Sequence, residues 1–184
     1  MKKTVIIIAG VVLVVAVYVM SVYNGLITKR EAVDNQWAQV ETQYQRRLDL
    51  IPNLVESVKG VMKQEQTIFT ALADARTRYA GATTINDKAA AATGVESAFG
   101  RLLAIMENYP QLKSSENVQT LMVQLEGTEN RVSVERKRFN DNVRVLNVSI
   151  KTFPSSLVAG IFGFAQRNYF EAAAGAENAP AVKF

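Results

Sequence analysis

The chain contains neither cysteine nor histidine among its 184 residues. Without cysteine it can form no disulfide and no thiolate metal site. Without histidine it lacks the commonest general base and the commonest metal ligand, and the di-iron site of helical bundles, built on Glu-x-x-His pairs, cannot be formed. We therefore expect no enzyme activity, no catalytic residue, no metal and no cofactor.

Other signatures of chemistry are also missing from the sequence. No glycine-rich phosphate loop with a lysine is present, and Gly160-x-x-Gly163 lacks the strand–turn–helix context that a nucleotide site requires. Glu126 and Glu129 have the spacing to face one partner, but a solvated helix face explains them. No segment alternates apolar and polar residues as a strand does, so the sequence predicts an all-α protein.

The charge balance is close to neutral, with 21 Lys and Arg against 17 Asp and Glu. Two of the cations, Lys2 and Lys3, lie before the first apolar segment. Basic residues between Arg131 and Arg144 alternate with acidic ones, which predicts ion pairs along an exposed helix, or contact with anionic lipid headgroups. We expect no nucleic-acid partner.

The segment Thr4 to Thr28 has no charged residue. Its 25 residues would reach about 37 Å as a helix, against about 30 Å of hydrocarbon in a bilayer. A cleaved signal peptide is the alternative, but the apolar run is longer than usual and no small-x-small site closes it. We predict a single membrane span, represented by Thr4, Val5, Ile6, Leu13, Tyr18, Tyr23 and Thr28.

Helical periodicity follows the span without a strong stop, since Tyr23-Asn24-Gly25 only lowers helix propensity. Apolar residues, Trp37 and Tyr44 among them, recur every three or four positions, which predicts an amphipathic helix with these two side chains in the core. Pro52 predicts a kink rather than an end. Because the pattern continues to Tyr79, this first helix could exceed 70 residues.

Two further long helices are predicted, one starting near Asn86 with Thr84 or Asn86 as its cap, and one from Ser114-Ser115 to about Thr152. Phe153-Pro154 breaks the latter, and the apolar residues after it could form a short helix. We expect a membrane anchor over 1–28, an elongated antiparallel bundle of up to four helices over 29–171, and a flexible tail over 172–184.

Two groups of residues are candidate interaction surfaces. The charges of the first group could be solvated, paired inside the bundle, or in contact with another subunit. The second group could fold back on the bundle or contact a neighbouring subunit or lipid. The first group consists of Arg46, Arg47, Asp49, Pro52, Asn53 and Glu56, and the second of Leu157, Ile161, Phe162, Phe164, Tyr169 and Phe170.

The stretch Arg46 to Gly60, RRLDLIPNLVESVKG, resembles the signature of the bacterial LemA family. Shorter matches extend the resemblance over nearly the whole chain. They are Tyr23-Asn24-x-Leu26, V-D-N-Q-W at Val33, Y-P-x-L-K at Tyr109, T-E-N-R-V at Thr128, Asn140-x-x-Val143, Asn147, Pro154 and G-F-x-x-x-x-Y-F-E at Gly163.

The resemblance implies a single-pass protein of the bacterial inner membrane with a helical bundle and no transferable catalytic residues. Family members are linked to membrane organisation, magnetosome membrane formation, envelope stress and membrane proteases, and some place the bundle in the cytoplasm. Lys2 and Lys3 on one side of the span nearly balance Lys29 and Arg30 on the other, so charge leaves the sidedness open. Two hypotheses follow, a homo-oligomeric scaffold that organises the membrane and an adaptor for a membrane protease or signalling kinase.

Overall fold

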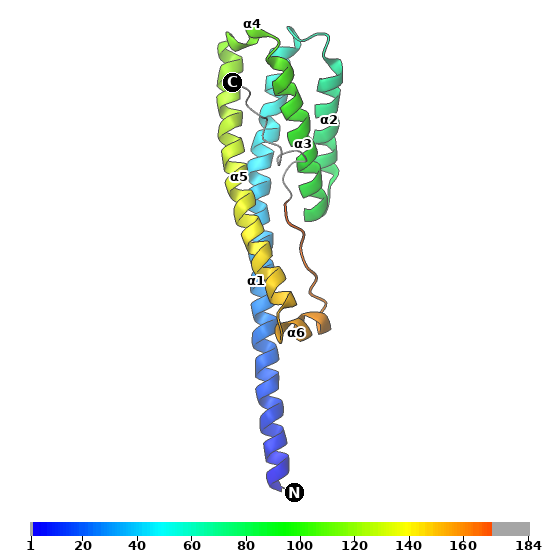
Figure 1. Ribbon diagram of the computed structural model, residues 1–184, viewed down its shortest axis with the longest axis vertical. Coiled ribbons are helices and arrows are strands. Elements are labelled where there is room, and N and C mark those ends of the chain that lie inside the picture. Colours follow the sequence, from blue (N-terminus) through cyan, green and yellow to red (C-terminus); the bar gives the residue numbers. More distant parts are fainter. Residues whose placement is uncertain (1, 171–184) are drawn as a thin grey trace, which may run out of the picture. The chain divides into compact units, whose positions relative to one another are not determined.

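The computed structural model describes residues 2–170, and every regular element in that range is an α-helix (Figure 1). The helices are α1 Lys2–Lys59, α2 Gln66–Gly81, α3 Ile85–Met106, α4 Pro110–Lys113, α5 Glu116–Lys151 and α6 Ser155–Ile161. The prediction of an all-α fold, with a long apolar N-terminal helix followed by a bundle, is confirmed. The predicted flexible tail over 172–184 lies outside the described residues.

The described chain divides into two compact units. The first comprises the residues up to Ala38 together with Arg138–Tyr169, and so contains the start of α1, the end of α5, and α6. The second comprises Gln39–Lys137 together with Phe170, and so contains the rest of α1, α2, α3, α4 and the start of α5. The division into an anchor over 1–28 and a bundle over 29–171 stays a prediction.

Helix α1 is a single element of 58 residues that passes through Tyr23-Asn24-Gly25 and includes Pro52. The expected continuation to Tyr79 is wrong, because α1 ends at Lys59 and α2 begins at Gln66. The turn between them is closed by hydrogen bonds from the amides of Val61 and Met62 to the carbonyl of Val58. Met62 is fully buried, so the apolar period continues across a reversal of the chain.

The ends of the later helices follow the sequence signals closely. The Thr84 hydroxyl accepts a hydrogen bond of 3.1 Å from the backbone amide of Asp87, so Thr84, one of the two predicted caps, is the cap of α3. Pro110 occupies the first turn of α4, where its missing N–H costs nothing. Helix α5 ends at Lys151, next to the predicted Thr152.

Each unit has its own apolar core. In the first unit, Trp37 packs edge to face on Phe139 with ring centroids 5.5 Å apart, and both are buried. In the second unit, α2 and α3 pack side by side (Figure 1), and Tyr44 is fully buried. The core role predicted for Trp37 and Tyr44 is confirmed. Buried apolar residues of the second unit include Leu48, Ile51, Leu54, Val58, Phe69, Leu72, Val95, Phe99, Leu102, Leu125 and Val132.

Candidate functional site

The start of α1 is an apolar helix with its side chains exposed in the described structure. Between Val5 and Met20 the large apolar side chains are mostly exposed, Val5 by 65% and Met20 by 64%. An 18-residue window of α1 has a mean hydropathy of 3.0, and this is the one helix within residues 2–170 that is long and apolar enough to cross a membrane. It is therefore a candidate transmembrane helix.

The last turns of the predicted span, from Val22 to Thr28, are instead partly covered by the protein. Leu26 is only 1% exposed. The Tyr23 ring lies 4.8 Å from the ring of Phe162 and 5.8 Å from that of Phe164, measured between centroids. The uncharged segment thus consists of an exposed part and a shorter part that contacts the region of α6.

One side of helix α6 packs on the rest of the first unit, and the other side is exposed. Val158 and Ala159 are buried, whereas Leu157 is 59% exposed and Ile161 78% exposed. The chain after α6 is held by Asn147, whose Nδ2 donates to the carbonyl of Arg167 (2.8 Å) and whose Oδ1 accepts from the Arg167 amide (2.9 Å). The Arg167 guanidinium also pairs with Asp34 at 3.2 Å. The buried Asn147 side chain therefore fixes the backbone of this segment at Arg167.

A buried polar network lies in the core of the second unit and centres on Glu96 of α3. Its carboxylate accepts hydrogen bonds from the Tyr44 hydroxyl and from Arg136, at 2.8 and 3.1 Å in the case of Arg136. The Glu96 and Arg136 side chains are only 12% and 17% exposed. The Phe170 ring lies parallel to the Tyr44 ring, with the two centroids 6.2 Å apart. The Arg136 guanidinium lies 4.4 Å from the centroid of the Phe170 ring. This network joins α1, α3 and α5.

Arg47 makes a second polar contact within the same unit. Its side chain pairs with Glu129 of α5, and its guanidinium lies 4.9 Å from the ring centroid of Phe99. Among the described residues its Nε has no hydrogen-bond partner. Arg47 is only 4% exposed and Phe170 only 5%. Both residues belong to the candidate interaction surfaces, for which packing inside the bundle was the alternative. The structure favours that alternative for these two, because their side chains are enclosed by contacts inside the bundle.

Burial also changes the acidity of two tyrosines of this core. Burial raises the pKa of Tyr44 well above its ordinary value, and the neighbouring Glu96 carboxylate, which also accepts its hydrogen bond, raises it further. The pKa of Tyr79 is raised by burial and, less, by Glu41. Both pKa values are higher in the folded protein than in the unfolded chain, so folding favours the protonated form of each tyrosine. The resulting stabilisation is complete at pH values below the pKa of tyrosine in the unfolded chain, and it is lost as the pH rises above that pKa.

We therefore expect the free energy of unfolding to fall above about pH 10, by up to about 1.4 kcal/mol per pH unit for each of these tyrosines. Tyr44→Phe should flatten this slope although it removes a hydrogen bond to Glu96. Urea unfolding followed by circular dichroism at several pH values between 7 and 11 measures how the free energy of unfolding changes with pH. The exposed Tyr169 supplies the control, since Tyr169→Phe should leave the slope unchanged. Equal slopes in all three proteins would contradict the expectation.

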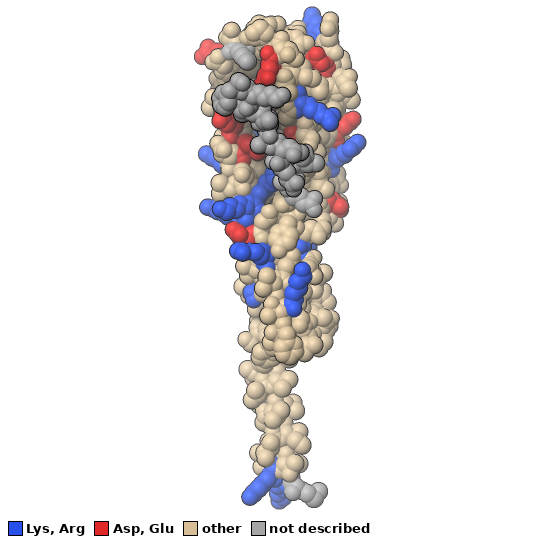
Figure 2. All heavy atoms as spheres, in the orientation of Figure 1, with Lys and Arg blue, Asp and Glu red and all other residues tan. Residues whose placement is uncertain are grey.

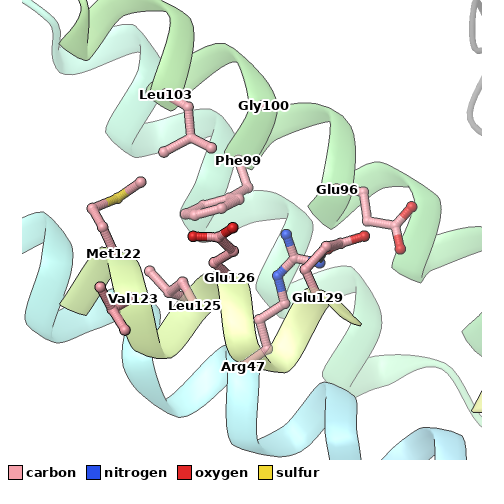
Figure 3. A pocket seen from close by; sticks show the side chains of 10 residues that line it. All are labelled: Arg47, Glu96, Phe99, Gly100, Leu103, Met122, Val123, Leu125, Glu126 and Glu129. Atoms are coloured by element: carbon pink, nitrogen blue, oxygen red, sulfur yellow. Dashed lines mark hydrogen bonds and ion pairs between the residues drawn. The ribbon is translucent and has the colours of Figure 1, made fainter. Parts of the chain in front are cut away.

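An open apolar groove runs between α3 and α5 in the second unit. Figure 3 shows Leu103, Met122 and Val123 at one end of the pocket of about 480 Å³, and the carboxylates of Glu126 and Glu129 towards the other. A second hollow continues the groove along Leu103, Met122 and Val123. Across residues 2–170, no group of three or more acidic side chains is placed to hold a metal ion. The apolar lining at one end of the groove is suited to apolar contacts.

The remaining residues of the first predicted surface lie along α1. Arg46, Asp49, Asn53 and Glu56 are exposed, and their spacing of three and four residues puts them on one helix face. Pro52 is half-buried and borders a hollow between α1 and α2. These five residues, like the exposed ones of the α6 region, stay candidates for an interaction surface.

Sequence reasoning did not single out Glu96, Arg136 as its partner, or the groove. One signal could have pointed to the network, because a tyrosine on an apolar stripe usually needs a hydrogen-bond partner for its hydroxyl. The partner itself is 52 residues away from Tyr44 along the chain. Helical periodicity gives no information on contacts at that separation.

Known proteins with similar sequences indicate the family of this chain. A family model described as the LemA family matches residues 36–184. Magnetosome protein MamQ of Magnetospirillum gryphiswaldense is 28% identical over 174 residues, which cover 80% of this chain and 64% of the relative. Magnetosome proteins MamQ 1 and MamQ 2 of Paramagnetospirillum magneticum are each 28% identical over 175 residues, 81% of this chain and 64% of theirs. The chain therefore spans less than two thirds of the length of these relatives.

The family match and the structure agree on the general nature of the protein. The match begins within α1 at residue 36 and includes all the later helices of the described chain. The uncharged segment of α1, Thr4 to Thr28, lies wholly before the match. A helical bundle behind such a helix indicates a membrane-associated helical protein. The chain belongs to the LemA family.

Proposed function

We propose that the protein is a non-enzymatic, single-pass scaffold of the bacterial inner membrane that self-associates to organise or remodel that membrane. The observation that carries the proposal is that α1 supplies both the candidate span and core residues of each unit. Leu26 and Val33 are buried in the first unit, and Leu54 in the second. The bundle therefore folds around the same helix that would hold it in lipid.

The relatives support the proposal in a general way. They are named magnetosome proteins, and the family resemblance implies a role in membrane organisation. Glu96 in the core of the second unit and Asn147 in that of the first accept or donate hydrogen bonds that join elements of the fold, which suits a structural role. Membrane lipids and further copies of the chain are the partners we propose.

The groove between α3 and α5 is the surface we propose for self-association. Val123, at its edge, is 68% exposed, and Met122 beside it can adapt its shape to a partner helix. Anchoring would confine all copies to one plane and raise their effective concentration, so a modest apolar contact suffices. The preferred occupant is a helix of a second copy.

The test compares Val123→Glu with Gln124→Glu, which adds the same charge at the exposed neighbouring residue outside the lining of the groove. We expect the wild type and Gln124→Glu to form oligomers in lipid nanodiscs or vesicles, and Val123→Glu to weaken association at least about tenfold, equivalent to about 1.4 kcal/mol. Cross-linking followed by mass photometry measures the distribution of monomers and oligomers in each protein. A wild-type protein that stays monomeric at all accessible concentrations would contradict the proposal.

A second candidate function, an adaptor for a membrane protease or signalling kinase, is favoured by the exposed polar face of α1. Arg46, Asp49, Asn53 and Glu56 lie within the stretch that resembles the LemA signature, yet they take no part in the core. A stoichiometric foreign partner that is recovered with the wild type and lost with Arg46→Glu, while oligomers persist, would favour this function. Arg47 is unsuitable for such a charge reversal because it is buried.

A further inference from the structure

We propose that α6 and its flanking aromatic residues form a second membrane contact, seated in the lipid interface beside the end of the α1 span. The contact surface, the α6 face, consists of Phe153, Leu157, Ile161 and Phe162. The inference rests on the proposed anchoring of α1 in the membrane. It adds a partner of defined chemistry, the bilayer, for a surface that the scaffold proposal does not use.

The composition of α6 is the first observation. Residues 157–164 contain no polar side chain at all. Leu157 and Ile161, four residues apart, lie on one side of the helix, opposite the buried Val158 and Ala159. A surface helix in water normally presents polar residues outward, whereas α6, after Ser155 and Ser156 in its first turn, is apolar on its packed side and on its free side.

The degree of exposure makes the composition significant. Phe153 is 76% exposed, Ile161 78%, Leu157 59% and Phe162 50%. Four large apolar side chains so close in sequence are more than the scattered exposed residues that soluble surfaces tolerate. Lipid would remove this surface from water.

Position within the first unit identifies lipid as the occupant. Phe162 contacts Tyr23, which lies just two residues after the exposed uncharged part of α1, residues 4–21. Figure 2 shows that the uncharged surface at α6 is continuous with the uncharged column of α1. Tyrosines such as Tyr18 and Tyr23 are favoured at the level of the headgroups.

Length supports the same placement. The exposed uncharged part of α1, residues 4–21, has a length of about 27 Å, slightly less than the hydrocarbon thickness of about 30 Å. A bilayer that covers this part therefore also reaches Tyr23 and the α6 face. Three cations of the same unit lie next to these apolar residues in the sequence. Lys29 and Arg30 follow the uncharged segment of α1, and Lys151, at the end of α5, precedes Phe153. Cations at this level attract anionic lipid headgroups.

The absence of cysteine makes the test direct, because single cysteines can be labelled in the full chain without a background. An environment-sensitive nitrobenzoxadiazole label is placed at Ile161→Cys, at Val12→Cys in the span, and at Asn53→Cys, an exposed position of α1 in the second unit. Each protein is reconstituted into phosphatidylcholine–phosphatidylglycerol vesicles with spin-labelled acyl chains. All three sites are exposed, so labelling should not unfold the protein.

We expect the label at Ile161 to shift to the blue and to be quenched by chain-labelled lipid, as at Val12, while the label at Asn53 stays unquenched. If Val12 is quenched but Ile161 is not, the proposal for α6 is overturned and the anchoring of α1 stands. A blue shift at Ile161 without lipid quenching assigns the α6 face to a second copy and also overturns it. If Val12 is not quenched, the anchoring proposal fails and this inference fails with it.

Discussion

Replacing Glu96 by alanine is expected to lower the free energy of unfolding by about 3 kcal/mol, because removing one member of a buried ion pair is strongly destabilising. The Arg136 guanidinium and the Tyr44 hydroxyl, which both donate to the Glu96 carboxylate, would lose this acceptor. Arg136 is only 17% exposed, so water replaces little of what is lost. Urea unfolding at pH 7, followed by circular dichroism on the detergent-solubilised protein, measures the change.

Glu126→Ala serves as the matched control for Glu96→Ala, because Glu126 is an exposed glutamate on a helix of the same unit. We expect its effect to stay within about 0.5 kcal/mol. The double variant Glu96→Leu with Arg136→Leu should recover part of the loss, since both charges of the buried pair are then replaced by apolar side chains. Equal small effects of Glu96→Ala and Glu126→Ala would show that the network contributes little to stability.

The helical fold could be predicted from sequence because the relevant signals are local. Thr84 and Asp87 are three residues apart, and their cap follows from residue type and spacing. The turn after Lys59 was missed for a physical reason. Met62 continues the apolar period and is buried, so the pattern indicates which residues face the core but not whether the chain reverses.

The contacts of the candidate site were harder to predict, because they join residues far apart in the chain. Arg46 and Arg47 are adjacent, yet Arg46 is exposed and Arg47 is buried against Phe99 and Glu129. The pair from Arg47 to Glu129 spans 82 residues. A single sequence gives the helix face of each side chain but not the partner helix that covers it. For the same reason the sequence left open whether Phe170 packs on the bundle.

Placing two arginines in the candidate span, as Val12→Arg with Val15→Arg, is expected to abolish membrane insertion. Each charge near the middle of a spanning helix costs about 2.5 to 3.5 kcal/mol, so the pair costs about 5 to 7 kcal/mol. Val12 and Val15 are 60% and 53% exposed, and neither supports the core of a unit. The bundle should therefore fold while the protein moves to the soluble fraction after carbonate extraction of membranes.

The control for the double arginine variant is Val12→Leu with Val15→Leu, which keeps the segment apolar and should stay in the membrane fraction. Intact mass separates the span from a cleaved signal sequence, because an anchor keeps Lys2 and Lys3 in the mature chain whereas a signal sequence is removed. If the wild type retained its N-terminus and the arginine variant still resisted carbonate, α1 would not be the anchor. Membrane association would then depend on the α6 face or on a partner, and the scaffold proposal would lose the observation that carries it.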